Sequence, residues 1–84
     1  MITVYFERFN QSRRIAEALR YFNKDVCQIF GSGMKKCAMN GKHTVITTWE
    51  CLEDAKDAAR YLHEVQEIGC LITWVADRDW ETKI

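Results

Sequence analysis

The 84-residue sequence contains no proline, and its charges cancel, with twelve basic and twelve acidic residues. No apolar run approaches the roughly 18 residues that a membrane-spanning helix needs. The first residues, MITVYFERF, lack the basic segment and long apolar segment of a signal peptide. A net charge of zero creates no global field that would attract nucleic acid or an anionic membrane. We therefore expect a cytoplasmic protein in which any polyanion binding is confined to a local patch.

Motifs for metal binding and for disulfides are also missing. The four cysteines, Cys27, Cys37, Cys51 and Cys70, include no C-x-x-C pair. They are scattered along separate predicted elements, unlike the clustered ligands of a structural zinc site. We expect free thiols, no metal and no cofactor.

The composition is that of a folded globular domain. Hydrophobic residues make up 48% of the chain and charged residues 29%, which is ordinary for soluble domains. A chain of this length supports one small hydrophobic core. The sequence therefore predicts a single domain.

The first half of the chain reads as a strand, a helix and a hairpin. Ile2 to Glu7 alternates with period two, as strands do, and Asn10 or Ser12 can cap a helix over residues 11–22. Val26 to Phe30 is a short β-prone run, which Met34 to Met39 extends or follows as a second strand. The apolar stripe of the predicted helix is Ile15, Ala18, Leu19 and Phe22.

Asn40-Gly41 predicts a hairpin turn of type I′, with residues 43–49 as the returning strand. A second helix begins at Leu52, and Gly69 is the expected residue after its end. Residues 70–76 form a final strand, and 77–84 form a polar tail that contains Trp80. The apolar stripe of the second helix is Leu52, Ala55, Ala59, Leu62 and Val65.

Cys51 occupies the expected N-cap of this second helix. A thiol at a helix N-terminus can become reactive, or it can be a weak cap with no chemical role. No histidine partner is recognisable beside it in the sequence. Both interpretations stay open at this stage.

The predicted order is β-α-β-β-α-β, which resembles the ferredoxin-like fold. That resemblance implies an α+β two-layer sandwich, with a four-stranded antiparallel sheet and two helices on one face. We expect residues 1–76 to form this domain and residues 77–84 to form the C-terminal tail. The fold hosts many unrelated functions, so it assigns none by itself.

One face of such a sheet has no helix over it. If Val4, Phe6, Ile46, Leu71 and Val75 face the helices, period two turns the intervening residues to the open face. Large exposed apolar and aromatic patches mark interaction sites, unless the tail covers them. The predicted partner-binding residues are Tyr5, Val45, Trp49, Ile72 and Trp74, joined by Trp80 of the tail.

An aromatic, neutral patch is typical of protein interfaces. We expect a small non-catalytic protein-binding module that either pairs with a second copy or acts as an inhibitor or adaptor of a larger protein. In size and lack of motifs the chain is similar to small inhibitors encoded by phages and other mobile elements, anti-CRISPR proteins included. The alternative is single-stranded RNA binding, because RNA-recognition domains share this topology.

The RNA alternative depends on a basic hairpin, but the predicted third strand lacks the stacking aromatics of an RNA-recognition motif. The possible nucleic-acid contacts are Lys35, Lys36, Lys42 and His43.

No set of catalytic residues is recognisable. Gly31-Ser32-Gly33 lacks the Lys-Ser/Thr pair of a phosphate-binding loop. His63 lies among carboxylates on the predicted second helix, as histidines on solvated helix faces often do. We therefore expect no enzymatic activity.

Overall fold

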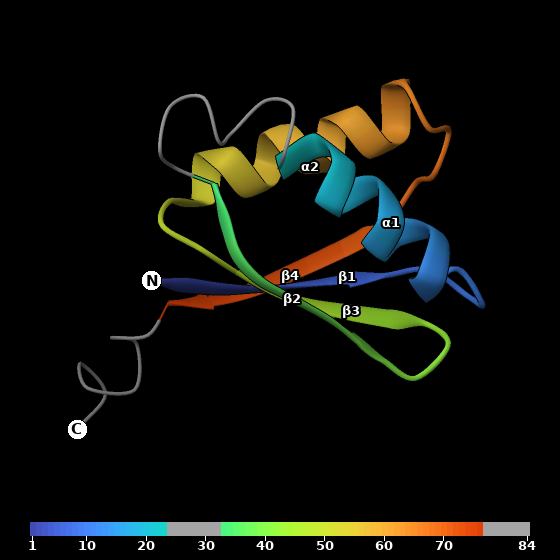
Figure 1. Ribbon diagram of the computed structural model, residues 1–84, viewed down its shortest axis with the longest axis horizontal. Helices are drawn as coiled ribbons and strands as arrows, with labels where there is room; N and C mark the ends of the chain where they lie inside the picture. Colours follow the sequence, from blue (N-terminus) through green and yellow to red (C-terminus); the bar gives the residue numbers. More distant parts are fainter. Residues whose placement is uncertain (24–32, 77–84) are drawn as a thin grey trace.

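The computed structural model describes residues 1–23 and 33–76. The strands form one antiparallel sheet in the order β2-β3-β1-β4, and Figure 1 shows both helices on the same side of it. This is the ferredoxin-like α+β sandwich that the sequence predicts. The elements are β1 (Ile2–Glu7), α1 (Ser12–Phe22), β2 (Met34–Asn40), β3 (Thr44–Trp49), α2 (Leu52–Glu64) and β4 (Leu71–Ala76).

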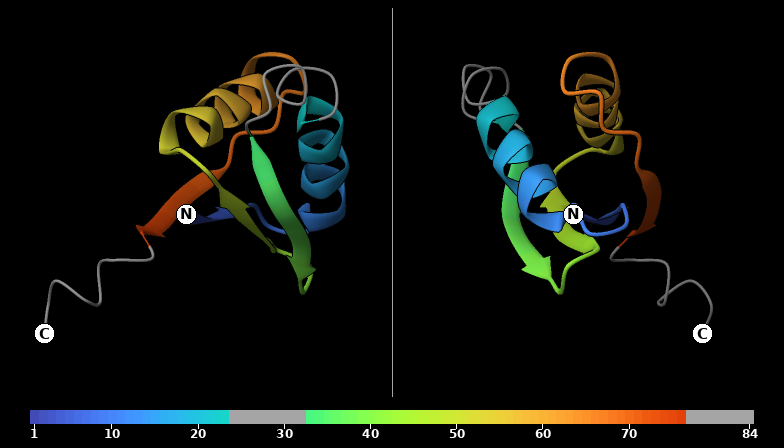
Figure 2. Two further views of the ribbon diagram at one scale, coloured as in Figure 1. Left: turned by 60° about the vertical axis from the view of Figure 1, so that its left-hand side comes forward. Right: turned by 90° about the vertical axis from the view of Figure 1, so that its right-hand side faces the viewer.

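Two expected segments lie outside the described residues. They are the β-prone run from Val26 to Phe30 and the tail of residues 77–84, which includes Trp80. Within the described residues, Figure 2 shows the two helices side by side over one sheet face, with no second layer on the other. The second strand of the fold is therefore β2, at the position of the predicted run from Met34.

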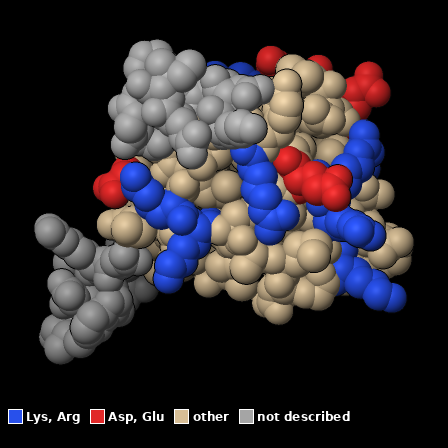
Figure 3. Space-filling model, viewed as in Figure 1, with Lys and Arg blue, Asp and Glu red and all other residues tan. Residues whose placement is uncertain are grey.

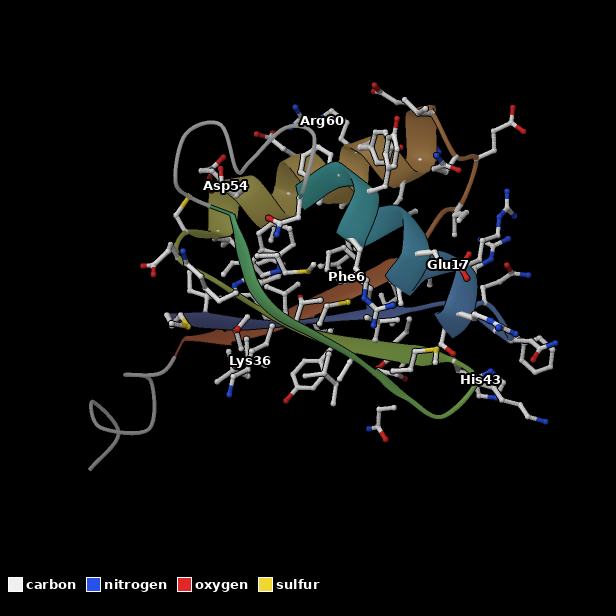
Figure 4. The ribbon with its side chains drawn as sticks, in the orientation of Figure 1. Phe6, Glu17, Lys36, His43, Asp54 and Arg60 are labelled. Atoms are coloured by element: carbon white, nitrogen blue, oxygen red, sulfur yellow. The ribbon has the colours of Figure 1, made fainter. Side chains whose placement is uncertain are left out.

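The core lies between this sheet and the helices. Phe6 is fully buried there, and Figure 4 shows its side chain between the two layers. The predicted stripe of α1 is confirmed, because all four of its residues are buried. Burial of one large aliphatic side chain stabilises a fold by about 1.5–3 kcal/mol, so the fully buried Ile15 and Leu19 hold α1 firmly to the sheet.

The second helix is bound through small side chains. Ala55 and Ala58 are buried with Leu62, so the helix backbone lies close to its neighbours. The helix ends at Glu64, and Val65, expected within the apolar stripe, is the C-cap residue and is 64% exposed. The chain then turns through Glu67, whose φ is 56°.

The prediction that Gly69 follows the helix directly was wrong. The C-cap is Val65, three residues earlier than a C′ glycine at position 69 requires, and the left-handed backbone conformation falls on Glu67 instead. Ile68, after this turn, returns to the core and is 3% exposed.

Neither Asn10 nor Ser12, the two residues predicted to cap α1, is its N-cap. The N-cap residue is Gln11, which makes no side-chain capping bond. Ser12 instead donates its hydroxyl to the Gly41 carbonyl oxygen at 2.7 Å, and the Asn10 N–H donates to Nδ1 of His43 at 2.7 Å. These residues therefore fix the β1–α1 loop to the β2–β3 turn.

The β2–β3 hairpin forms where it was predicted, but its turn is longer. Asn40 still pairs with Thr44 in the ladder, so the loop comprises residues 41–43. Gly41 has a φ of 77°, while Asn40 has no positive φ. A type I′ turn needs positive φ at both central positions, so that turn type was wrong.

The start of β2 is held by one side-chain amide. Oδ1 of Asn23 accepts the Met34 N–H at 2.8 Å, and its Nδ2 donates to the Met34 carbonyl oxygen at 3.1 Å. The amide thus pairs with the Met34 backbone as a neighbouring strand residue would. The end of α1 and the start of β2 are joined by this pair of bonds.

Candidate functional site

The sheet register decides which of the predicted partner-binding residues are available. Residues directly paired in an antiparallel ladder share one face. Phe6 pairs with Val45 on one side and with Ile72 on the other. Since Phe6 faces the helices, Val45 and Ile72 face them too, and their predicted place on the open face was wrong.

Trp49 is also on the helix side, and its predicted exposure was wrong. Its side chain is 0% exposed, as is that of Val45. Burial of an indole requires a partner for its N–H, and Nε1 donates to the Thr47 hydroxyl at 2.7 Å. That hydroxyl donates in turn to the Val4 carbonyl oxygen at 2.8 Å. The indole N–H and the threonine hydroxyl each have a hydrogen-bond partner, so the face of β3 that carries them can be buried in the core.

Trp74 pairs with Val4 and therefore also lies on the helix side of the sheet, again contrary to expectation. Because β4 is an edge strand, no neighbouring strand covers Trp74 from the outer side, and the residue remains 47% exposed. The ammonium of Lys56 on α2 lies 5.7 Å from the ring centroid, in range of a cation–π contact. Trp74 thus stays accessible at the edge rather than at the centre of the sheet.

The open face of the sheet carries few aromatic groups. Tyr5 is its one aromatic residue in the described part of the chain, and it is half-buried between Ile46 of β3 and Thr73 of β4. The open face also carries four threonines, which are Thr3 of β1, Thr44 and Thr48 of β3, and Thr73 of β4. The broad aromatic face that the sequence predicts is therefore not present in the described residues, which also removes the ring-stacking surface of an RNA-recognition domain.

The exposed apolar side chains gather on β4 instead. Leu71 is 64% exposed and Val75 is 50% exposed, both on the open face. Trp74 adds its ring from the other face, so the strand projects apolar groups to both sides. All six residues of β4, LITWVA, are uncharged. Sequence reasoning placed Leu71 and Val75 in the core, although the absence of charge from this strand was visible.

The opposite edge of the sheet has a different character. β2 carries Lys35 and Lys36, and its ladder with β3 is irregular between Met34 and Lys36. Figure 4 shows Lys36 on the side of the sheet away from the helices. Charged side chains and bulges are the devices by which proteins keep an edge strand from pairing with another chain. β2 has both, and β4 has neither.

The predicted nucleic-acid contacts separate into two places. Lys35 and Lys36 lie at the start of β2, whereas Lys42 and His43 lie in the turn at its other end. The His43 ring stacks on Phe9, with centroids 4.9 Å apart and planes 15° from parallel. Phe9, which sequence reasoning missed, is 81% exposed. Its position between a strand and a helix start gave no signal of this contact.

The described cysteines are free thiols. Burial raises the pKa of Cys37 and of Cys70, and the nearby Arg20 and Arg8, respectively, offset part of that rise. Cys51 is exposed at the N-cap of α2 and makes no capping hydrogen bond through its side chain. The expected N-cap position is confirmed.

Within residues 1–23 and 33–76, no three His, Cys, Asp or Glu side chains are grouped to hold a metal ion. No pocket is found in the described structure. Neither described helix is both long and apolar enough to cross a membrane.

No protein-family model, curated protein or solved structure matches this chain. Its function has to be argued from its own residues.

Proposed function

We propose that this chain is a non-catalytic protein-interaction domain that associates with a second copy of itself through the edge of β4. The observation that carries the proposal is the contrast between the two edges of the sheet. β2 bears two lysines and a bulge, whereas β4 is uncharged and exposes Leu71, Trp74 and Val75. An edge strand of the second kind is a template for strand pairing.

Strand pairing provides both affinity and specificity at such an edge. The outer side of β4 presents main-chain N–H and C=O groups, which a neighbouring strand would bind. Apolar side chains on both faces of the strand would become buried in the same event. Each buried CH₂ group contributes roughly 0.8 kcal/mol, so the exposed leucine, tryptophan and valine side chains supply a substantial driving force.

Charge favours a second copy as the partner. In a two-fold symmetric dimer the same surface meets itself, so a charged group close to the axis faces its own copy. β4 has no charged residue, and its self-pairing therefore brings no like charges together within the strand. Pairing at β2 would instead place Lys35 and Lys36 of both copies in one interface, which concentrates positive charge there.

An antiparallel pair centred on Thr73 fits the faces of the strand. It places Leu71 opposite the partner's Val75, which are both open-face positions. It places Ile72 opposite the partner's Trp74, on the helix side. Each exposed apolar side chain then meets another apolar side chain, and the four-stranded sheet continues into that of the second copy.

The test is the molar mass in solution, measured by light scattering after size exclusion over a dilution series with reductant present. Wild-type protein is expected at about twice the chain mass of 9.9 kDa. Val75→Lys and Leu71→Glu should each weaken the dimer by at least about tenfold, because a charge is buried opposite an apolar group. Met39→Lys is the matched control, because Met39 is 51% exposed on the other edge strand.

Mixing the two variants tests the register. A Val75→Lys chain and a Leu71→Glu chain would place lysine opposite glutamate at one contact, so the mixture should recover the dimer that each variant alone loses. A wild-type monomer at every concentration would refute self-association and redirect the search to a heterologous partner for β4. Dimers of normal strength from Val75→Lys would show that the association uses another surface.

A further inference from the structure

We propose that Phe9, His43, Lys42 and Arg13 form a binding site for single-stranded nucleic acid, at the end of the molecule where the β1–α1 loop meets the β2–β3 turn. This site is independent of β4, and it does not use the open face of the sheet.

The centre of the site is a stacked pair of rings. Phe9 and His43 lie 4.9 Å apart at 15°, and Phe9 leaves 81% of its surface exposed. A ring that is held rigidly in solvent offers its free face to another flat ring, and unpaired bases stack on aromatic side chains in this way.

The pair is held in place by backbone hydrogen bonds between two loops. The Arg8 N–H donates to the His43 carbonyl oxygen at 2.9 Å, and the Ser12 N–H donates to that of Lys42 at 3.0 Å. The Ser12 hydroxyl adds a bond to the Gly41 carbonyl oxygen. A site whose parts are fixed before binding loses less entropy when the ligand arrives.

The histidine ring is oriented by the Asn10 N–H, which donates to Nδ1 at 2.7 Å. In the neutral ring the proton is then on Nε2, because one nitrogen accepts and the other donates. The ring thus has a donor available for a phosphate oxygen beside its stacked face. Among the described residues, Nε2 has no hydrogen-bond partner.

Two basic residues lie in the segments that hold this stack, although the whole chain is neutral. Arg13 and Lys42 come from the two segments that the Ser12–Lys42 backbone bond joins. Across α1, β2 and the turn there are six Lys or Arg residues and one acid, Glu17. Figure 3 shows Lys and Arg side chains spread over the face that α1 and β2 form. The basic residues are Arg13, Arg14, Arg20, Lys35, Lys36 and Lys42.

The single acid leaves most of this charge unpaired. Arg13 and Glu17 approach to 3.8 Å, but both side chains are largely exposed, and such pairs contribute little. α2 has the opposite balance, with four acids against Lys56 and Arg60.

Base stacking and phosphate neutralisation in one place favour nucleic acid over an acidic peptide. A peptide of Asp and Glu would use the basic residues but would gain nothing from the ring pair. A duplex would use the charges too, but its bases are already stacked on one another. A single strand uses both features.

Binding would be measured by fluorescence anisotropy with a labelled oligonucleotide of about twelve nucleotides, as single-stranded RNA, as single-stranded DNA and as duplex. We expect single-stranded RNA and single-stranded DNA each to bind more tightly than the duplex, and we expect the affinity to fall as the salt concentration rises. Phe9→Ala should weaken single-strand binding about tenfold through lost stacking. Lys42→Gln should weaken it and reduce the salt dependence.

Lys56→Gln and Arg60→Gln on α2 are the matched controls and should bind as wild type. Phe9 is exposed, so its replacement should leave the melting temperature unchanged. The β4 variant Val75→Lys should also bind normally, which separates this site from the proposed dimer. No binding at low salt, equal affinity for polyglutamate, or full binding by Phe9→Ala would each overturn the proposal.

Discussion

The indole N–H of Trp49 donates to the hydroxyl of Thr47 two residues earlier on the same strand, at 2.7 Å. Both side chains are fully buried. The hydroxyl in turn donates to the Val4 carbonyl oxygen at 2.8 Å, so these hydrogen bonds connect β3 to β1 inside the core. A buried donor without a partner costs free energy. These two hydrogen bonds therefore decide which face of β3 can be buried.

Thr47→Val should therefore destabilise the fold by about 1–3 kcal/mol, because the near-isosteric change leaves the Trp49 N–H buried without its acceptor. The neighbouring Thr48→Val is the matched control. The Thr48 hydroxyl oxygen is buried and has no hydrogen-bond partner, so its removal should be neutral or stabilising. Urea denaturation followed by tryptophan fluorescence measures both. An equal loss in the two variants would contradict the role of Thr47.

Asn23→Ala should lower the free energy of unfolding by about 1–2 kcal/mol, since two hydrogen bonds to the Met34 backbone disappear. Asn40→Ala, an exposed residue on the same strand as Met34, should change stability by less than about 0.5 kcal/mol. Chemical denaturation gives both values. A harmless Asn23→Ala would mean that the start of β2 does not depend on the amide.

Cys51 should react with iodoacetamide at neutral pH at least about tenfold faster than Cys37 and Cys70. Burial raises the pKa of the latter two thiols, which reduces the thiolate that attacks the reagent, while Cys51 is exposed. Peptide mapping by mass spectrometry after timed quenching gives each rate separately. Equal rates at all three sites would show that burial does not protect Cys37 and Cys70.

Stability should decline in alkaline solution. The folded-state pKa values of Cys37 and Cys70 lie above those of the unfolded chain, so the unfolded state releases its thiol protons first. The stabilisation is fully present below the unfolded thiol pKa of about 8.5, and it is lost as the pH rises from there through the folded pKa values.

Urea denaturation from neutral pH to above pH 9, with reductant present, would measure this decline. The double variant Cys37→Ala/Cys70→Ala should show a shallower fall than wild type, because tyrosines and lysines titrate equally in both. Parallel curves would contradict the contribution of the thiols.

Some of this architecture is determined by local sequence. The stripe from Ile15 to Phe22 has one possible helical face, so α1 and its buried residues follow from spacing alone. The order of strands and helices follows from the same periodicities, together with the turn at Gly41. Given that order, the right-handed crossover rule leaves few sheet topologies, and the ferredoxin-like one is observed.

The faces of β3 and β4 were decided only in three dimensions. On β3 each alternating set contains both apolar residues and threonine, and on β4 both sets are apolar except for Thr73. Period two therefore fits two registers equally well. Pairing with Phe6 selects one of these registers. The hydrogen bond between Trp49 and Thr47 allows both polar groups to be buried in that register. That choice moved two tryptophans to the helix side and left Leu71 and Val75 exposed.

The two candidate surfaces depend on these tertiary choices to different degrees. The unprotected edge of β4 combines a composition visible in the sequence with an edge position that requires the complete strand order. The stack of Phe9 on His43 joins residues 34 positions apart through contacts between two loops, and no local periodicity encodes such a contact. Local sequence determined the elements of this protein, and long-range pairing decided which of their side chains reach the solvent.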